Sequence, residues 1–299
     1  MPDDRLTVLL DTDIGTNIDD ALALAWLLSE PRCALAGITT VTGRPQVRAR
    51  LADAICRAFG RPDVPIHGGS ARPLCRPVEQ EDVPQAAVLE RHPHREDFAG
   101  DTAVDFLQRT IRDRPGEITL LTIGPLTNIA RLLALDPEIP GLLRRHVMMG
   151  GACFGAPPPY GPAERNVRLD PEAAAAVLSA GTGEVCALGL DVTTRCAMPS
   201  ADLATRLRGG PAGILADLLD LWHAGGREQV ILHDPLAAVA TLFPQTCTWR
   251  RGRIRVDTCP DGPAGRTHLA PCDDGRHRVA ADVRPELFFE HFLGALPGT

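Results

Sequence analysis

The sequence predicts an α/β fold in which one mostly parallel, open sheet with a Rossmann-like core is flanked by helices. Three observations support this prediction. Segments with helical periodicity alternate along the chain with short apolar runs, which are typical of strands buried on both faces. Alternation at this spacing favours parallel strands joined by right-handed crossovers. No internal repeat or low-complexity linker divides the 299 residues, so we expect a single domain spanning residues 1–299.

The first strand and the first helix have the clearest signals. Residues 6–10 form a continuous apolar run, and residues 21–29 are strong helix formers that end before Pro31. Other apolar runs predict strands at residues 34–41, 64–67, 118–123, 146–149 and 184–190, and alternating stretches predict strands at 253–257 and 277–283. Periodic apolar positions predict helices at residues 45–59, 102–112, 124–135, 171–180 and 285–296, and an interrupted helical region at 201–243.

Residues 72–100 differ from the rest of the chain. They are rich in Pro, Glu, His and Arg and show no sustained periodicity. A long irregular segment inside a compact domain is more often a lid or a binding loop than a simple connection. We therefore predict a lid or binding loop here.

Composition excludes several classes of partner. The net charge of −7 argues against a nucleic-acid polymer as ligand, and no apolar run approaches the length of a membrane span.

The first residues carry no signal-peptide pattern. The nine cysteines are odd in number and include no CxxC pair, which favours reduced thiols over a disulfide framework. We expect a cytoplasmic protein.

The chain contains no lysine, because all 31 basic residues are arginine. This excludes Schiff-base chemistry, a lysine general base and a Walker-type phosphate site. It also weakens one interpretation of the Asp-Thr-Asp motif at residues 11–13. That motif resembles the haloacid-dehalogenase-like phosphatases, which normally add a lysine to hold the phosphoryl group.

The loop between the first strand and the first helix concentrates four carboxylates, those of Asp11, Asp13, Asp19 and Asp20, with Gly15 allowing a tight bend. Four like charges in one loop repel one another unless a cation joins them. The carboxyl end of a buried strand is also where α/β sheets bind ligands. A hard divalent cation with oxygen ligands would satisfy the loop. The alternative is that Asp19 and Asp20 only cap the helix.

Several stretches together resemble one family, the inosine–uridine-preferring nucleoside hydrolases, which are calcium-dependent N-ribosidases. The resemblance runs from about residue 6 to 292. The motifs that carry it are Asp-Thr-Asp-Ile-Gly (11–15), Asp-Asp-Ala-Leu-Ala-Leu (19–24), Gly-Ile-Thr-Thr-Val-Thr-Gly (37–43), Ile-Gly-Pro-Leu-Thr-Asn-Ile-Ala (123–130), Met-Gly-Gly (149–151), Glu-Arg-Asn (164–166), Asp-Pro-Glu-Ala-Ala (170–174), Gly-Leu-Asp-Val-Thr (189–193) and His-Asp-Pro-Leu-Ala (233–237).

The resemblance implies a Ca²⁺ site and a reaction. The ligands would be the carboxylates of Asp13, Asp20 and Asp234 and the backbone carbonyl of Ile123. These hard oxygen donors suit Ca²⁺ better than Zn²⁺. Asp13 would also act as general base on a calcium-bound water that hydrolyses the N-glycosidic bond, giving free base and ribose.

The same resemblance assigns the substrate contacts. Asp19 and Asn166 would bind ribose hydroxyls, Glu164 the 5′-hydroxyl, and Met149 would pack under the sugar ring. His233 would lie near the leaving base and protonate it. For His233 and Asn166 the alternatives are a helix-start histidine satisfied by backbone and a simple helix cap. The implied partner is a small nucleoside-like molecule, and the implied assembly is a homodimer or homotetramer.

Three positions depart from the family pattern. Arg44 stands where the family usually has Asn or Asp, Pro158 falls where an Asn is expected, and Arg165 replaces the usual aromatic residue. We therefore expect the 5′ end of the ribose and the base to differ from those of a common nucleoside, and the two arginines could accept an anionic group. A second hypothesis is a ribose- or nucleotide-binding protein that keeps the metal site but is catalytically weak.

A third hypothesis is a zinc site in the C-terminal part of the chain. Cys259, His268, Cys272 and His277 provide suitable ligand types. Their spacing is irregular and the segment is rich in Pro and Gly, so an ordinary loop is the favoured interpretation.

Overall fold

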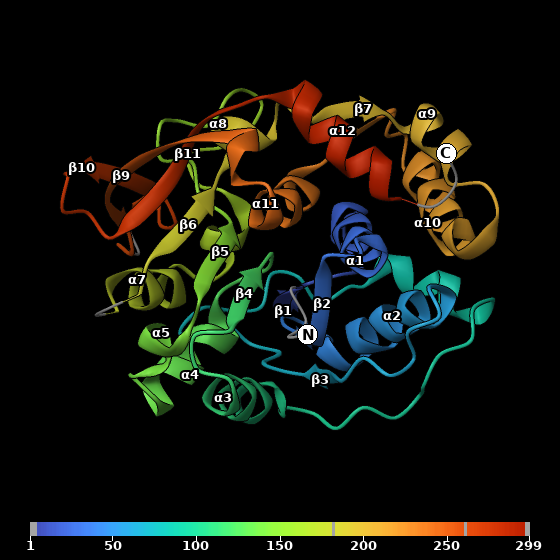
Figure 1. Ribbon diagram of the computed structural model, residues 1–299, viewed down its shortest axis with the longest axis horizontal. Helices are drawn as coiled ribbons and strands as arrows, with labels where there is room; N and C mark the ends of the chain where they lie inside the picture. Colours follow the sequence, from blue (N-terminus) through green and yellow to red (C-terminus); the bar gives the residue numbers. More distant parts are fainter. Residues whose placement is uncertain (1–4, 181–182, 260–261, 297–299) are drawn as a thin grey trace.

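The computed structural model describes residues 5–180, 183–259 and 262–296, and a single large sheet runs through the domain (Figure 1). The order of its strands is β10-β9-β11-β6-β5-β4-β1-β2-β3. Their bounds are β1 Leu6–Thr12, β2 Cys33–Thr40, β3 Ile66–Gly68, β4 Ile118–Thr122, β5 Arg145–Met149, β6 Val185–Leu188, β9 Cys247–Val256, β10 Thr267–Pro271 and β11 His277–Val283. All pairings from β3 to β11 are parallel, and β9 and β10 extend the sheet antiparallel.

Helices cover both faces of this sheet, as the sequence predicted. The helices are α1 Asp19–Ser29, α2 Pro45–Ala58, α3 Ala103–Asp113, α4 Thr127–Leu135, α5 Ile139–Leu142, α6 Arg165–Leu169, α7 Pro171–Ser179, α8 Leu190–Thr193, α9 Ser200–Arg206, α10 Gly213–Ala224, α11 His233–Leu242 and α12 Pro285–Ala295. Helices α3, α4, α5 and α7 pack on one face, and α1, α2 and α8 to α12 pack on the other (Figure 1).

Strand β1 shows why its sequence is apolar at every position. Leu9 points into the core beneath α3 and α4, whereas Val8 and Leu10 point into the core beneath α1 and α11, and all three are fully buried. A strand that contributes to two cores cannot alternate with polar residues. Burying each of these side chains contributes roughly 1.5–3 kcal/mol. The strand is therefore fixed in the middle of the sheet, with its carboxyl end leading into the acidic loop.

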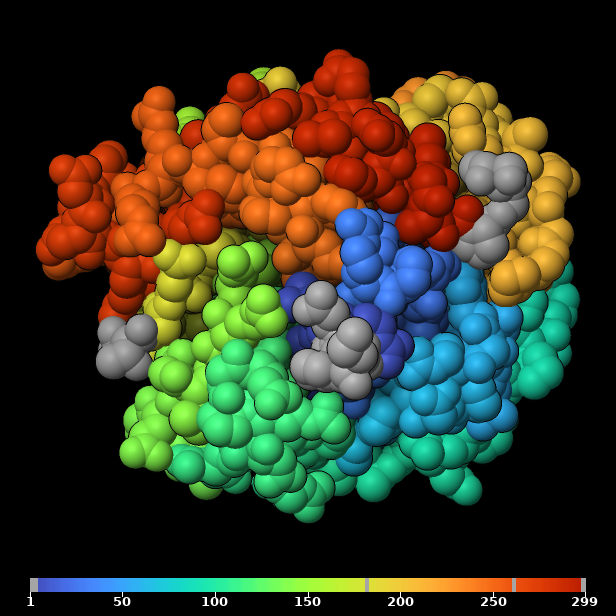
Figure 2. All heavy atoms as spheres, in the orientation of Figure 1, coloured from blue at the N-terminus to red at the C-terminus, as the bar shows by residue number. Residues whose placement is uncertain are grey.

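The first helix, α1, packs against α11 and α12, the last two helices of the chain. The indole nitrogen of Trp26 donates to the carbonyl oxygen of His291 at 3.1 Å. Figure 2 shows the result at the surface, where the blue N-terminal segment adjoins the orange and red C-terminal helices. Because α1 and α11 are neighbours, their N-terminal residues lie close together although the sequence separates them by more than 200 positions.

Besides the short helices α5, α6 and α8, which were not predicted, two regions differ from the sequence prediction. Region 201–243 is not uniformly helical, because β8 (Gln229–Ile231) pairs antiparallel with β7 (Ala197–Pro199) in a small second sheet. In the C-terminal part, β9 begins at Cys247 and not near residue 253, and β10 was not predicted. The missed strands are short (β7, β8 and β10) or carry several arginines (β9), so their apolar alternation is weak.

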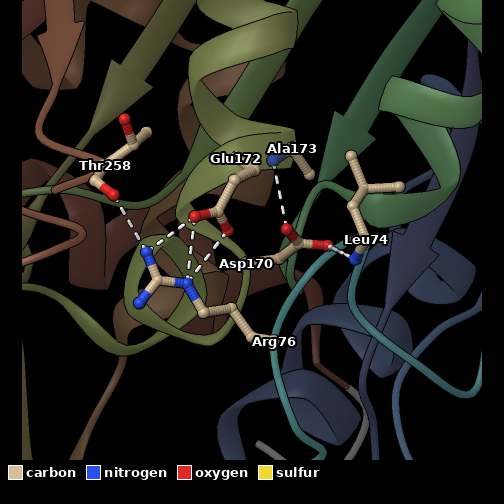
Figure 3. A network of polar contacts seen from close by, with 6 residues as sticks. All are labelled: Leu74, Arg76, Asp170, Glu172, Ala173 and Thr258. Carbon is tan, nitrogen blue, oxygen red and sulfur yellow. Dashed lines mark hydrogen bonds and ion pairs between the residues drawn. The ribbon is translucent and has the colours of Figure 1, made fainter. Parts of the chain in front are cut away.

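The irregular segment 72–100 is fastened to the domain and contains the 3₁₀ helix η1 (Pro84–Glu90). Figure 3 shows how its first part is held. Arg76 forms an ion pair with Glu172 at 2.6 Å and donates to the carbonyl oxygen of Thr258, and the backbone N–H of Leu74 donates to Asp170. The same Asp170 caps α7 by accepting from a backbone N–H. Within the described residues, no helix has both the length and the apolar character needed to cross a membrane.

Buried His146 makes the stability of the fold depend on pH. Its ring contacts the Thr122 hydroxyl at 3.0 Å, and burial lowers its pKa from 6.5 to about 4. The unfolded state therefore binds more protons between these pH values, and the free energy of unfolding falls as the pH drops from 6.5 to 4, by at most ~3 kcal/mol for this group.

We predict that H146Q flattens this decline in urea-unfolding titrations, whereas H268Q at an exposed histidine leaves it unchanged. An equal decline in H146Q and the wild type would contradict this assignment.

Candidate active site and metal centre

A cavity of about 200 Å³ lies at the carboxyl edge of the sheet. All nine predicted site residues line it: Asp13, Asp19, Asp20, Ile123, Met149, Glu164, Asn166, His233 and Asp234. Tyr160, Arg165 and Arg168 are also part of the wall. The sequence motifs, which are spread over more than 200 residues, thus meet in one place.

The tightest group in this wall is a triad of carboxylates. Asp19, Asp20 and Asp234 each offer an oxygen within 4.8 Å of the others, and all three side chains are buried. Burial raises the pKa of Asp19 to about 6, with the nearby charge of Asp13 adding to the effect. Burial and the charges of neighbouring aspartates also raise the pKa of Asp20 and Asp234 well above their usual range. A divalent cation at this point would remove the repulsion that these shifts reflect.

The four aspartates of the cavity wall come from three parts of the chain. Asp13 follows β1, and Asp19 and Asp20 form the first turn of α1. Asp234 lies in the first turn of α11, which follows β8 of the small sheet, so it does not come from a strand end of the main sheet. The packing of α11 on α1 brings the two helix starts together. Each helix N-terminus also favours negative charge.

Asp13 is held by two neighbours that the sequence analysis did not identify. Gln80, from the irregular segment 72–100, donates from Nε2 to Asp13 Oδ2 at 3.0 Å. The guanidinium of Arg48 donates to the backbone carbonyl oxygens of Asp13 and Ile14, and also to the Thr16 hydroxyl at 3.2 Å. Both the side chain and the backbone of Asp13 therefore have defined partners.

Arg48 is a fully buried cation beside the acidic loop. Its Nε donates to the carbonyl oxygen of Thr42 at 2.8 Å, so that it links the start of α2 to the loop after β1. Desolvation lowers the pKa of its guanidinium, while Asp13 and Asp20 oppose that effect. A sequence signal existed, because Arg48 shares one helical face with buried Leu51, Ala52 and Ile55.

Asp11, the first carboxylate of the acidic loop, lies outside the cavity wall. It is fully buried and accepts from the Thr39 hydroxyl at 2.5 Å and the Asn128 amide at 2.7 Å. Burial raises its pKa to about 7, against the effect of these two donors. Asn128 also accepts from the backbone N–H of Ser70. Asp11 therefore joins β1, β2 and α4 behind the site and does not face the cavity.

Glu164 and Asn166 fix the ends of β4 and β5. Glu164 is the N-cap of α6, where its carboxylate accepts from the backbone N–H groups of Gly151, Asn166 and Val167. The Asn166 amide donates to the carbonyl oxygen of Ile123 at 3.0 Å and to that of Met149 at 3.3 Å. The cap that the sequence analysis considered for Asn166 is thus formed by Glu164, and Asn166 instead links two strand ends.

His233 lies at the start of α11 with its ring in the cavity wall. Its Nδ1 pairs with the Thr193 hydroxyl at 2.7 Å, and Tyr160 packs edge-to-face against it with ring centroids 6.1 Å apart. Burial lowers the pKa of His233 to about 4, so the imidazole is neutral at pH 7. The sequence analysis considered that backbone groups alone satisfy His233. In the structure its ring is instead held by the Thr193 hydroxyl.

The three positions that depart from the family pattern differ in whether they reach the cavity. Arg165 reaches the cavity wall, whereas Arg44 and Pro158 are not among its residues. Arg168 also reaches the wall, but it pairs with Glu79. Of the two arginines expected to face an anionic group, the structure thus brings only Arg165 to the site.

The two histidines considered for a zinc site have other partners. His268 pairs with Asp257 at 3.0 Å, and His277 contacts the carbonyl oxygen of Leu178. Over residues 5–180, 183–259 and 262–296, the aspartate triad is the cluster of three or more metal-suited side chains that the structure assembles. It contains neither cysteine nor histidine. The zinc hypothesis therefore gains no support.

A buried acidic cavity at the carboxyl edge of an α/β sheet defines a class of small-molecule binding proteins whose site is suited to a hard metal cation. Comparison with known proteins specifies the family. Residues 8–290 match the family of inosine-uridine preferring nucleoside hydrolases, and the chain belongs to that family. It is an enzyme of the nucleoside hydrolase type, which cleaves the N-glycosidic bond of ribonucleosides.

Individual relatives agree with this assignment. The chain is 31% identical to uridine nucleosidase 1 of Arabidopsis thaliana over 84% of its own length and 78% of the relative. It is 33% identical to the pyrimidine-specific ribonucleoside hydrolase RihA of Salmonella agona, with 85% of each chain covered. Among solved structures, a purine-preferring ribonucleoside hydrolase from Gardnerella vaginalis superposes with a TM-score of 0.84 at 28% identity, covering 97% of this chain and 98% of the other.

Removing one charge from the triad tests the electrostatics of the site. We predict that D234N raises the melting temperature of chelator-treated protein, because it removes a buried like charge without changing the side-chain volume. The same variant loses most of the rise in melting temperature that Ca²⁺ gives the wild type. D113N, at an exposed aspartate remote from the triad, serves as the matched control. A wild type that does not respond to Ca²⁺, or a destabilised chelator-treated D234N, would contradict this account.

Proposed function

We propose that the protein hydrolyses the N-glycosidic bond of a ribonucleoside in a Ca²⁺-dependent reaction, with uridine as the first substrate to test. The observation that supports this most is the convergence of buried Asp13, Asp19, Asp20 and Asp234 in one cavity beside Glu164. The names of the two relatives favour a pyrimidine base. The solved structure from Gardnerella vaginalis is instead named as purine-preferring, so the panel of test substrates must include both pyrimidine and purine nucleosides.

The residues of the cavity fit a hard divalent cation. Asp13, Asp20, Asp234 and the carbonyl oxygen of Ile123 would hold it, and every one of these donors is oxygen. Asp19, assigned to ribose by resemblance, also belongs to the tightest carboxylate triad. When bound, the cation makes water more acidic and orients the sugar diol.

Asp13 would serve as the general base. Its carboxylate accepts a proton from the attacking water, whose oxygen forms the new bond to the anomeric carbon as the bond to the base breaks. The electron pair of the broken bond leaves with the base. Positive charge develops on the sugar in this transition state, and the buried carboxylates of Asp19 and Glu164 would stabilise it.

The other wall residues would orient the ribose. The Asn166 amide N–H₂ is engaged by the carbonyl oxygens of Ile123 and Met149, which leaves its side-chain oxygen to accept from a sugar hydroxyl. Asp19 would bind a second hydroxyl and Glu164 the 5′-hydroxyl. The Met149 side chain would pack under the ring. A sugar held in this way presents its anomeric carbon to Asp13.

His233 would assist departure of the base as a neutral donor. If the Thr193 hydroxyl donates to Nδ1, the ring carries its proton on Nε2 and can donate a hydrogen bond to the leaving base. The low pKa of His233 argues against a stored imidazolium at pH 7. This refines the role suggested by sequence, from a protonated acid to a neutral hydrogen-bond donor.

The proposal extends to the state of the protein in the cell. Family resemblance suggests a homodimer or a homotetramer. All nine cysteines are free thiols, and five of them are buried, which supports a reducing, cytoplasmic environment. Light scattering of the purified protein tests the assembly.

The function is tested by measuring release of base and reducing sugar from a nucleoside panel, with Ca²⁺ and with EDTA. We predict multiple turnovers with Ca²⁺ and loss of activity with EDTA. D13A lowers kcat by about 10³-fold or more, because general-base catalysis alone contributes about 10²–10⁴-fold, whereas D113N is unaffected. Full activity without metal, or in D13A, would refute the mechanism. Tight Ca²⁺-dependent nucleoside binding without turnover would instead favour a catalytically weak binding protein.

A further inference from the structure

Gln80 connects two residues of the cavity wall from behind. Its Nε2 donates to Asp13 Oδ2 at 3.0 Å and to the Thr16 hydroxyl at 2.6 Å. Its Oε1 accepts from the guanidinium of Arg165. Asp13 and Arg165 both face the cavity, whereas Gln80 is buried and is not itself part of the wall. The three side chains form one continuous chain of hydrogen bonds.

Arg165 fixes which way the Gln80 amide points. A guanidinium can only donate hydrogen bonds, so the atom facing Arg165 must be the carbonyl oxygen of the amide. The N–H₂ group then faces Asp13 and Thr16 and leaves Asp13 Oδ2 as an acceptor. Without Arg165 the amide could rotate and present its oxygen to the carboxylate, and two acceptors would then repel each other.

The backbone of Gln80 also packs against a neighbouring part of the domain. A Cβ added at Gly43, which has a φ of +63°, would collide with the Gln80 carbonyl oxygen, so the turn after β2 packs directly on this residue. Upstream, Arg76 is fastened to Glu172 (Figure 3), and Glu79 pairs with Arg168. The irregular segment therefore delivers Gln80 to a fixed position.

The two oxygens of Asp13 consequently have different surroundings. Oδ2 is bonded to Gln80, while Oδ1 lies 3.2 Å from the place where a Cβ on Gly124 would be, next to Ile123 at the end of β4. Oδ1 thus lies beside the residue that follows Ile123, and the hydrogen bond from Gln80 to Oδ2 restrains rotation of the carboxylate about its Cβ–Cγ bond. Restraining a ligand by hydrogen bonds from behind is how surrounding residues tune metal affinity.

We infer that Gln80 is a positioning residue for Asp13 and that Arg165 affects the reaction through Gln80. The inference rests on the proposed function, because it assigns Asp13 to the cation and to the attacking water. Arg165 forms no ion pair with any residue that the structure describes, and the five surrounding carboxylates of the cavity make direct binding of an anionic substrate unfavourable. Its contact with Gln80 gives it a function without such a substrate.

The test compares Q80A, Q80E, R165A and Q80A/R165A with the wild type. We predict that Q80A lowers kcat for uridine about 10–100-fold with KM changed less than about threefold, since support behind a ligand is worth that much. Q80E keeps the contact with Arg165 but cannot donate to Asp13, so it loses kcat as Q80A does. R165A lowers kcat in the wild-type background and has no further effect in Q80A.

Calorimetric Ca²⁺ titration provides a measurement that does not require turnover. Q80A raises the Kd for Ca²⁺ about tenfold or more. The matched control is Q108A, which removes a glutamine-to-carboxylate hydrogen bond of 2.9 Å at Asp136, away from the cavity. Q108A leaves kcat and the Kd unchanged. Thermal unfolding of each variant verifies that it is folded.

Two results would overturn the inference. The first is a Q80A variant with wild-type kcat and Ca²⁺ affinity. The second is an R165A variant that raises KM at constant kcat by the same factor with and without Gln80, which would place Arg165 in direct contact with substrate. Absence of nucleoside hydrolysis by the wild type would defeat the proposed function alone, and the Ca²⁺ titration would still decide the role of Gln80.

Discussion

The burial of several carboxylates against one another is the constraint on which the rest of this structure depends. Asp13, Asp19, Asp20 and Asp234 are all removed from water in one cavity, where their charges repel one another strongly. A fold can maintain such a group only if rigid elements hold it against this repulsion. The sheet and the helix pair α1–α11 supply the rigidity. The same unfavourable charge makes the site ready to bind a cation.

Hydrogen-bond donors from several elements surround the acidic loop and stabilise it. The buried guanidinium of Arg48 stabilises the loop after β1 through carbonyl oxygens and leaves the carboxylates of that loop to the cavity. The Thr12 hydroxyl donates to Asp20 at 2.5 Å, and Gln80 donates to Asp13. The hydroxyl of Thr12 and the amide of Gln80 are uncharged, so each orients a carboxylate without neutralising it. The site therefore combines fixed geometry with unbalanced negative charge, which favours tight binding of a hard ion.

Sequence reasoning succeeded where the signal was local and strong. The apolar run of β1 predicted a strand buried on both faces, and the acidic loop after it predicted the position of the cavity. The family resemblance assigned nine site residues, all of which line that cavity. It failed to find Gln80, because an irregular segment offers no periodicity from which a contact can be inferred. Arg48 was detectable from its helical spacing. The role of Asp11 behind the site depends on Thr39 and Asn128, which only the folded chain brings near it.

The central claim is that this cavity binds one Ca²⁺ through oxygens of the β1 loop, the end of β4 and the start of α11. A crystal structure of the protein grown with Ca²⁺ tests it most directly. The account predicts an ion within about 2.3–2.6 Å of carboxylate oxygens of Asp13, Asp20 and Asp234 and of the Ile123 carbonyl oxygen. A cavity without an ion at saturating Ca²⁺, or an ion bound without Asp13 and Asp234, would contradict it.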